Sequence, residues 1–216
     1  TGMVAPGVGT FTYGLRGIAC LEAKVHGPAI DLHSGIFGGA VANPVTAVAR
    51  LSATLHDAEG RVMMDGFYDG VRPIANWERT AWAALGDGDA EMLELTGSPA
   101  LFGEPGYTER ERRWARPTAE VNGIGGGYQG EGSKTVIGRE AFVKLSFRLV
   151  PDQNPKDIME KAKQANDADL ARMKTELRRE VGRLVVATST NRGATWSAPV
   201  QVSGNEGYAF YQGLDV

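Results

Sequence analysis

Apolar and polar residues alternate along two stretches of the chain, and this alternation predicts two β-strands. In residues 17–25 the odd-numbered positions are all small or aliphatic, and in residues 141–150 the odd-numbered positions are again apolar while most even ones are polar. A period of two residues places successive side chains on opposite faces of an extended chain. Pro151 ends the second strand because proline cannot continue a hydrogen-bonded ladder. Residues 118–124 predict a third, less regular strand.

Between these strands the apolar residues recur every three to four positions, as on one face of a helix. Residues 45–55 show this spacing, with Asn43 suited to cap the helix and Pro44 to occupy its first turn. Gly60 follows in a turn and is free to adopt a left-handed conformation. Further helices are predicted at residues 73–85, 89–96, 108–114 and 157–180.

The order strand, helix, insertion, strand, strand, helix predicts an α/β (α+β) fold. We expect a two-layer, ferredoxin-like sandwich whose largely antiparallel sheet carries helices on one face. Residues 72–116 form a helical insertion that contains three of the four tryptophans. Residues 1–180 are predicted to be one domain, and residues 181–216 a β-rich tail.

Composition narrows the possible functions. The 216 residues are 42% hydrophobic, but no apolar run is long enough for a membrane span, and no basic region followed by an apolar core predicts a signal peptide. The net charge of −3, with both signs interleaved, argues against a nucleic-acid partner. The single cysteine, Cys20, excludes an internal disulfide and a cysteine-based metal cluster. A reducing, cytoplasmic location is the simplest expectation.

The most informative candidate for chemistry is His33, which lies in the glycine-rich stretch of residues 31–39. A histidine on a loop is placed to contact something outside its own fold. The alternative is an imidazole bonded only to its neighbours Asp31 or Ser34. The other histidines, His26 and His56, fall at the ends of predicted elements, and no paired metal-ligand motif accompanies them.

Several segments, in this order along the chain, resemble the zinc-dependent dipeptidase, aminoacylase and carboxypeptidase G family. The resemblance is to the lid, or dimerisation, domain of the carnosinase-like branch, and it covers about residues 1–158. The segments are residues 13–17, 22–25, 31–44, 60–62, 66–68, 134–137 and 147–151.

This resemblance implies specific roles for three residues. His33 matches a histidine that crosses the dimer interface into the partner's active site and stabilises the oxyanion of the tetrahedral intermediate. Thr135 and Arg148 match the pair that holds the carboxylate end of the substrate, and we expect the Thr135 hydroxyl to lie near the Arg148 guanidinium. Gly138 stands where the family often has proline, so the loop around Thr135 is expected to be looser.

The resemblance also implies what surrounds such a domain. In the family, two zinc ions are held in a catalytic domain that flanks the lid on both sides. We therefore expect this chain to bind no metal and to be inactive alone. As part of a zinc metallopeptidase it would form a homodimer and contact a peptide or N-acyl amino acid substrate.

A second hypothesis comes from the C-terminal tail. Residues 189–196 resemble the Asp-box hairpin of sialidase-type β-propellers, with Asn191 in place of the usual aspartate. One copy is too short for a propeller, which needs repeated blades. The alternative function is therefore a non-catalytic binding module that recognises a glycan through this tail.

Overall fold

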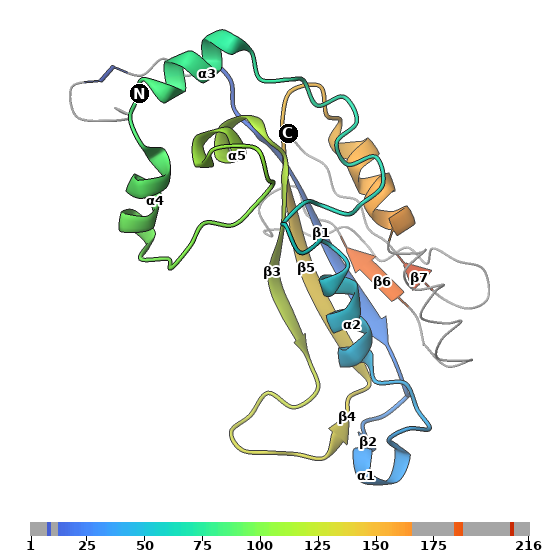
Figure 1. Cartoon of the computed structure of the whole chain (residues 1–216). Coiled ribbons are helices and arrows are strands. Elements are labelled where there is room, and N and C mark those ends of the chain that lie inside the picture. Colours follow the sequence, from blue (N-terminus) through green and yellow to red (C-terminus); the bar gives the residue numbers. More distant parts are fainter. Residues whose placement is uncertain (1–7, 10–12, 166–183, 188–207, 210–216) are drawn as a thin grey trace.

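The computed structural model describes residues 8–9, 13–165, 184–187 and 208–209. Its main feature is a five-stranded sheet with the order β3-β5-β1-β6-β7 (Figure 1). The strands β1 and β5 pair antiparallel over their whole length; β3 is antiparallel to β5, β6 is antiparallel to β1, and β7 runs parallel to β6. The bounds are β1 Gly17–His26, β3 Thr118–Gly126, β5 Glu140–Leu149, β6 Leu184–Ala187 and β7 Tyr208–Ala209.

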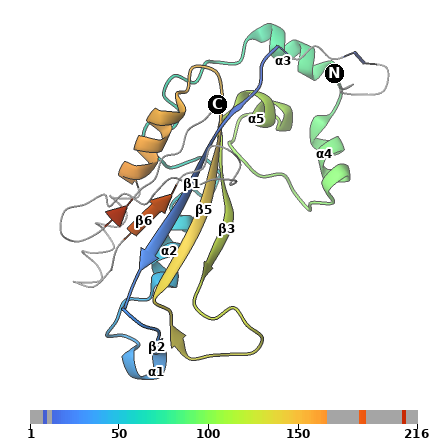
Figure 2. The ribbon, with the colours of Figure 1, turned by 180° about the vertical axis from the view of Figure 1, so that it is seen from behind.

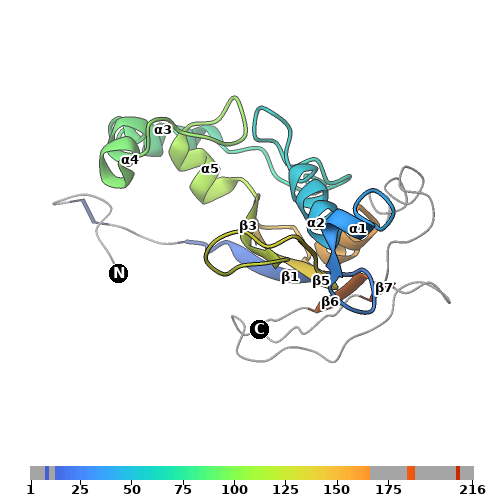
Figure 3. The same cartoon turned by 90° about the horizontal axis from the view of Figure 1, so that it is seen from below.

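The alternation predicted from the sequence separates a buried face of the sheet from an open one. On β1 and β5 the odd-numbered side chains are buried, and they pack beneath α2 (Pro44–Ala53) and the helix at residues 155–165. Both helices lie on the same side of the sheet (Figure 3). The predicted sandwich, with a largely antiparallel sheet and helices on one face, is thus confirmed. The largest fully buried side chains are Phe67, Phe147, Leu21, Leu149, Ile158, Val25, Val48 and Val143.

Local signals in the sequence determine where α2 begins and how its following turn closes. The Asn43 side chain accepts a hydrogen bond of 2.9 Å from the Val45 N–H, and Pro44 occupies the first turn. Both features match the expected cap. Gly60 has a φ of +89°, the left-handed conformation expected of it.

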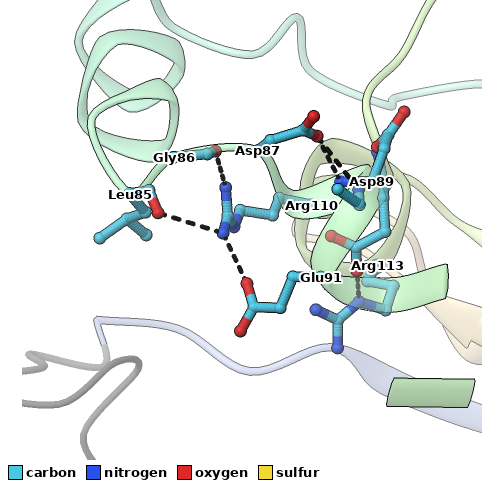
Figure 4. Close-up of polar contacts among 9 residues, drawn as sticks. Leu85, Gly86, Asp87, Asp89, Glu91, Arg110 and Arg113 are labelled. Carbon is cyan, nitrogen blue, oxygen red and sulfur yellow. Dashed lines mark hydrogen bonds and ion pairs between the residues drawn. The ribbon is translucent and has the colours of Figure 1, made fainter. Parts of the chain in front are cut away.

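The insertion lies beyond the end of the sheet at which β3 begins (Figure 2). It forms the helices α3 (Asn76–Ala83), α4 (Gly88–Thr96) and α5 (Glu109–Ala115), close to the predicted ranges. Arg110 of α5 connects the three helices, because its guanidinium donates to the Leu85 and Gly86 carbonyls after α3 and to Glu91 of α4 (Figure 4). Trp82 and Trp114 pack edge to face, with ring centroids 5.5 Å apart.

A small two-stranded ribbon lies at the opposite end of the sheet from the insertion (Figure 1). It consists of β2 (Leu32–His33) and β4 (Val136–Ile137), and the short helix α1 (Ser34–Phe37) follows β2 directly. The tail motif at residues 189–196 lies outside the described residues. Among the residues that the structure describes, no helix is both long and apolar enough to cross a membrane.

Candidate functional site

His33 occupies a position that is exposed but held by two hydrogen bonds. It is the last residue of β2 and the N-cap of α1. Its Nδ1 accepts from the Gly35 backbone N–H at 3.0 Å, and its Nε2 lies 3.0 Å from the Thr135 Oγ1. The imidazole therefore bonds to Gly35 and Thr135, and not to Asp31 or Ser34, the partners considered from the sequence.

The loops that carry His33 and Thr135 are 102 residues apart in the sequence and are joined by backbone contacts. His33 pairs with Val136 in the ribbon, and the Ser34 N–H donates to the Thr135 carbonyl at 3.1 Å. Asp31 supports the same junction by accepting from the Arg139 N–H at 2.9 Å. These contacts explain why the imidazole and the hydroxyl face each other although both are exposed.

Arg148 lies on the open face of the sheet, near the end of β5. It pairs with Ile18 on β1 and with Thr118 on β3, and its side chain is exposed. No hydrogen bond or ion pair to it is found within the described part of the chain. An exposed guanidinium is the kind of group that can hold a carboxylate through two parallel hydrogen bonds.

The charge of Arg148 acts on two nearby side chains, Arg16 and Cys20. Burial lowers the pKa of the Arg16 guanidinium, and the nearby positive charges of Arg148 and Arg113 lower it further. Burial raises the pKa of the Cys20 thiol, an effect that the charge of Arg148 opposes. The negative charge of Glu120 acts on Arg16 in the opposite direction, so charges of both signs lie near this end of the sheet.

The structure corrects one expectation about this site: Thr135 and Arg148 of the same chain are not neighbours. Thr135 adjoins β4 at the ribbon end, before β5 starts at Glu140, whereas Arg148 is near the last residue of that strand. The eight steps from Glu140 to Arg148 span about 26 Å, at roughly 3.3 Å per residue. The two side chains belong to opposite ends of the sheet because β5 runs its full length between them.

Other features lie apart from these three residues. A cavity of about 780 Å³ opens beside the insertion, and Tyr13, Trp77, Trp82 and Trp114 are among its lining residues, but His33, Thr135 and Arg148 are not. Tyr13 donates a hydrogen bond to Glu78 there, and burial together with this bond raises the pKa of Tyr13 to about 12. Within the described ranges, no group of three His, Cys, Asp or Glu side chains is arranged to hold a metal.

The sheet, its one-sided helical layer and the histidine ribbon together form a small α/β module. The chain belongs to the M20 peptidase dimerisation domain family, whose model matches residues 13–174.

Named relatives agree with this assignment. The Cys-Gly metallodipeptidase DUG1 of Candida albicans is 35% identical over 147 residues, which cover 68% of this chain and 30% of that protein. The Beta-Ala-His dipeptidase of Mus musculus is 32% identical over 151 residues, covering 69% of this chain and 30% of that protein. The chain thus spans about a third of the length of these relatives.

Solved structures show the same fold. The structure of the dipeptidase Dug1p from Saccharomyces cerevisiae superposes with a TM-score of 0.68 at 31% identity, covering 76% of this chain and 34% of that one. Human carnosine dipeptidase 1 gives a TM-score of 0.71 at 26% identity, and the match covers 81% of this chain and 36% of that one.

Proposed function

We propose that this chain is the lid and dimerisation domain of a zinc-dependent metallopeptidase that hydrolyses dipeptides or related N-acyl amino acids in the cytoplasm. In this proposal His33 stabilises the oxyanion, and Thr135 and Arg148 bind the substrate. The family membership and the dipeptidase names of the relatives support the activity class.

The observation that carries the proposal is the separation of Arg148 from the His33–Thr135 pair. A dipeptide is far shorter than the roughly 26 Å between Glu140, at the ribbon end of β5, and Arg148. One copy of the domain therefore cannot bring both ends to one substrate. Two copies can, if the ribbon of one protomer reaches the active site in which Arg148 of the other takes part.

The chemistry of each residue suits its proposed role. A positioned N–H donor directed at the developing oxyanion contributes about 3 kcal/mol to transition-state stabilisation. The guanidinium of Arg148 can hold a carboxylate through two parallel hydrogen bonds. The described residues do not form a zinc site, so the metal, which activates water and polarises the scissile carbonyl in such enzymes, would be held by the catalytic domain.

The dimer contact that we propose involves the edge strand β3. Among the strands that the structure describes, β3 pairs with β5 alone, and its side chains Val121 and Ile124 are 40% and 52% exposed. They oppose Leu145 and Val143 of β5, so they lie on the helical side of the sheet. Pairing with a second β3 would cover an edge that is otherwise prone to aggregation, and a two-fold axis would make the contact identical for both copies.

Subunit mixing in the full-length enzyme that carries this domain tests the proposal. His33→Ala and Arg148→Ala subunits are each expected to form nearly inactive homodimers. In a mixed dimer, the site that combines Arg148 of the His33→Ala subunit with the ribbon of the Arg148→Ala subunit is intact. The other site carries both mutations. Equal mixing should therefore restore up to about a quarter of the wild-type activity, since half the dimers are mixed and half their sites are intact.

A matched pair of variants provides the control. His33→Ala and Thr135→Ala affect the same ribbon, so every site of their mixed dimer lacks one of the two groups, and no activity should return. Restoration in this control, or none in the His33 and Arg148 mixture, would contradict the shared-site arrangement.

A further inference from the structure

We propose that Gly35 is a positioning residue that fixes His33 as a neutral imidazole with its proton on Nε2. The inference deepens the proposed function, because it assigns the protonation state in which His33 would meet the substrate. Gly35 contributes in two ways. Its backbone N–H donates a hydrogen bond to Nδ1 of His33, and its lack of a side chain leaves room for the imidazole ring.

The tautomer follows from which atoms can donate. A backbone N–H is only a donor, so the Nδ1 that lies 3.0 Å from the Gly35 nitrogen must present its lone pair. The single proton of a neutral imidazole then belongs to Nε2, which lies 3.0 Å from the Thr135 Oγ1. The threonine oxygen accepts a hydrogen bond from this Nε2–H, and its own hydroxyl hydrogen remains able to donate outward.

This arrangement prepares a donor for an oxyanion. The other tautomer would place a proton on Nδ1 facing the Gly35 N–H, and Thr135 would then donate to Nε2. In that state His33 would have no N–H to offer on the Nε2 side. With the proton on Nε2, a negatively charged substrate oxygen can replace the neutral Thr135 oxygen as acceptor.

Steric space explains why the position is glycine. A Cβ on residue 35 would lie 2.8 Å from Cε1 and 3.1 Å from Nδ1 of His33. The Gly35 backbone is outside the positive-φ region, so glycine is needed here for space and not for conformation. The ring is an exposed side chain that can move, so Gly35→Ala should displace the imidazole and leave the fold intact.

Nitrogen NMR of this 216-residue chain tests the proposal directly. The two imidazole nitrogens are measured at alkaline pH, where histidine is neutral, and a His33→Gln variant identifies the signals among the three histidines. We expect His33 Nδ1 to resonate in the unprotonated range and Nε2 in the protonated range. The opposite order, or two equal averaged shifts, would overturn the assignment.

Two variants separate the role of Gly35 from that of Thr135. Gly35→Ala should collapse the shift difference between the two nitrogens with little change in melting temperature, whereas Thr135→Val should preserve it. Gly14→Ala is the matched control, because a Cβ there meets nothing within 4 Å. An unchanged spectrum in Gly35→Ala would refute the positioning role.

The spectroscopy does not depend on catalysis. If the tautomer is as assigned but His33→Ala leaves turnover of the full-length enzyme unchanged, the proposed function fails while the role of Gly35 stands. If subunit mixing succeeds but the tautomer is reversed, the positioning inference fails alone.

Discussion

At the scale of single residues, His33 contributes little to the stability of its own domain. Its side chain is exposed, and it makes two hydrogen bonds at the surface, each worth about 1 kcal/mol or less net. His33→Ala should therefore shift the melting temperature of the chain by only a few degrees. In the full-length enzyme it should lower turnover about a hundredfold, the effect of losing one oxyanion donor. Calorimetry and steady-state kinetics measure the two quantities; a large fall in melting temperature would indicate a structural role instead.

Cys20 offers a second residue-level test, because it reports on the charge of Arg148. Burial raises the pKa of its thiol, and Arg148 lowers it, so the thiol should be alkylated slowly near neutral pH, where little thiolate is present. Removing the positive charge in Arg148→Met should raise the pKa further and slow alkylation a few-fold. Stopped-time mass spectrometry with iodoacetamide measures the rate.

The control for this experiment is Arg72→Met, which removes an exposed arginine paired with Asp152. Its alkylation rate should match that of the unaltered chain. Faster alkylation in Arg148→Met would show that the guanidinium mainly covers the thiol, and that its charge has the smaller effect.

At the scale of elements, periodicity was sufficient for the long strands and helices and insufficient for the short ones. β5 was predictable because its ten residues repeat with a period of two, and α2 because its cap and its spacing agree. β2 and β4 have two residues each, too few for any period, and they exist because two distant loops pair. The hydrogen bond between His33 and Thr135 depends on that pairing, so the resemblance could name both residues but not place them together.

The insertion is held by a buried ion pair whose loss should be costly. Arg116, which follows α5, makes two hydrogen bonds of 2.7 Å to Glu104, and both side chains are more than nine-tenths buried. Glu104→Ala would leave a buried guanidinium without its partner. We expect a loss of about 3–5 kcal/mol in the free energy of unfolding.

Chemical denaturation measures this loss, with a surface pair as the comparison. Arg72 and Asp152 are 2.7 Å apart but about two-thirds exposed, so Arg72→Ala should cost at most about 1 kcal/mol. Equal losses in Glu104→Ala and Arg72→Ala would mean that the Arg116 pair is effectively solvated and does not hold the insertion together.

At the scale of the whole molecule, the two ends of the sheet have different roles. The ribbon with His33 lies at one end, and Arg148 and the insertion lie toward the other (Figure 1). We expected Thr135 and Arg148 to be close because Thr135 begins the strand-like segment that precedes the Arg148 strand, and only 12 residues lie between them. An extended strand converts such a short separation into a long distance, whereas a helix of the same length would have kept them closer. This elongated arrangement is what makes a second copy necessary in the proposed enzyme.

The assembly itself can be tested on this chain. If β3 forms the dimer contact, a carboxylate introduced at position 124 would be buried against the partner. In the monomer the same carboxylate would stay about half exposed, as the Ile124 side chain is. Ile124→Asp should therefore weaken self-association at least tenfold, or about 1.4 kcal/mol, without lowering the stability of the monomer. Leu95→Asp, at a 77% exposed position in α4 away from this edge, is the matched control and should leave the dimer intact. Sedimentation equilibrium over a range of micromolar concentrations measures both dissociation constants. A chain that stays monomeric throughout, or a dimer that Leu95→Asp disrupts and Ile124→Asp does not, would remove β3 as the interface.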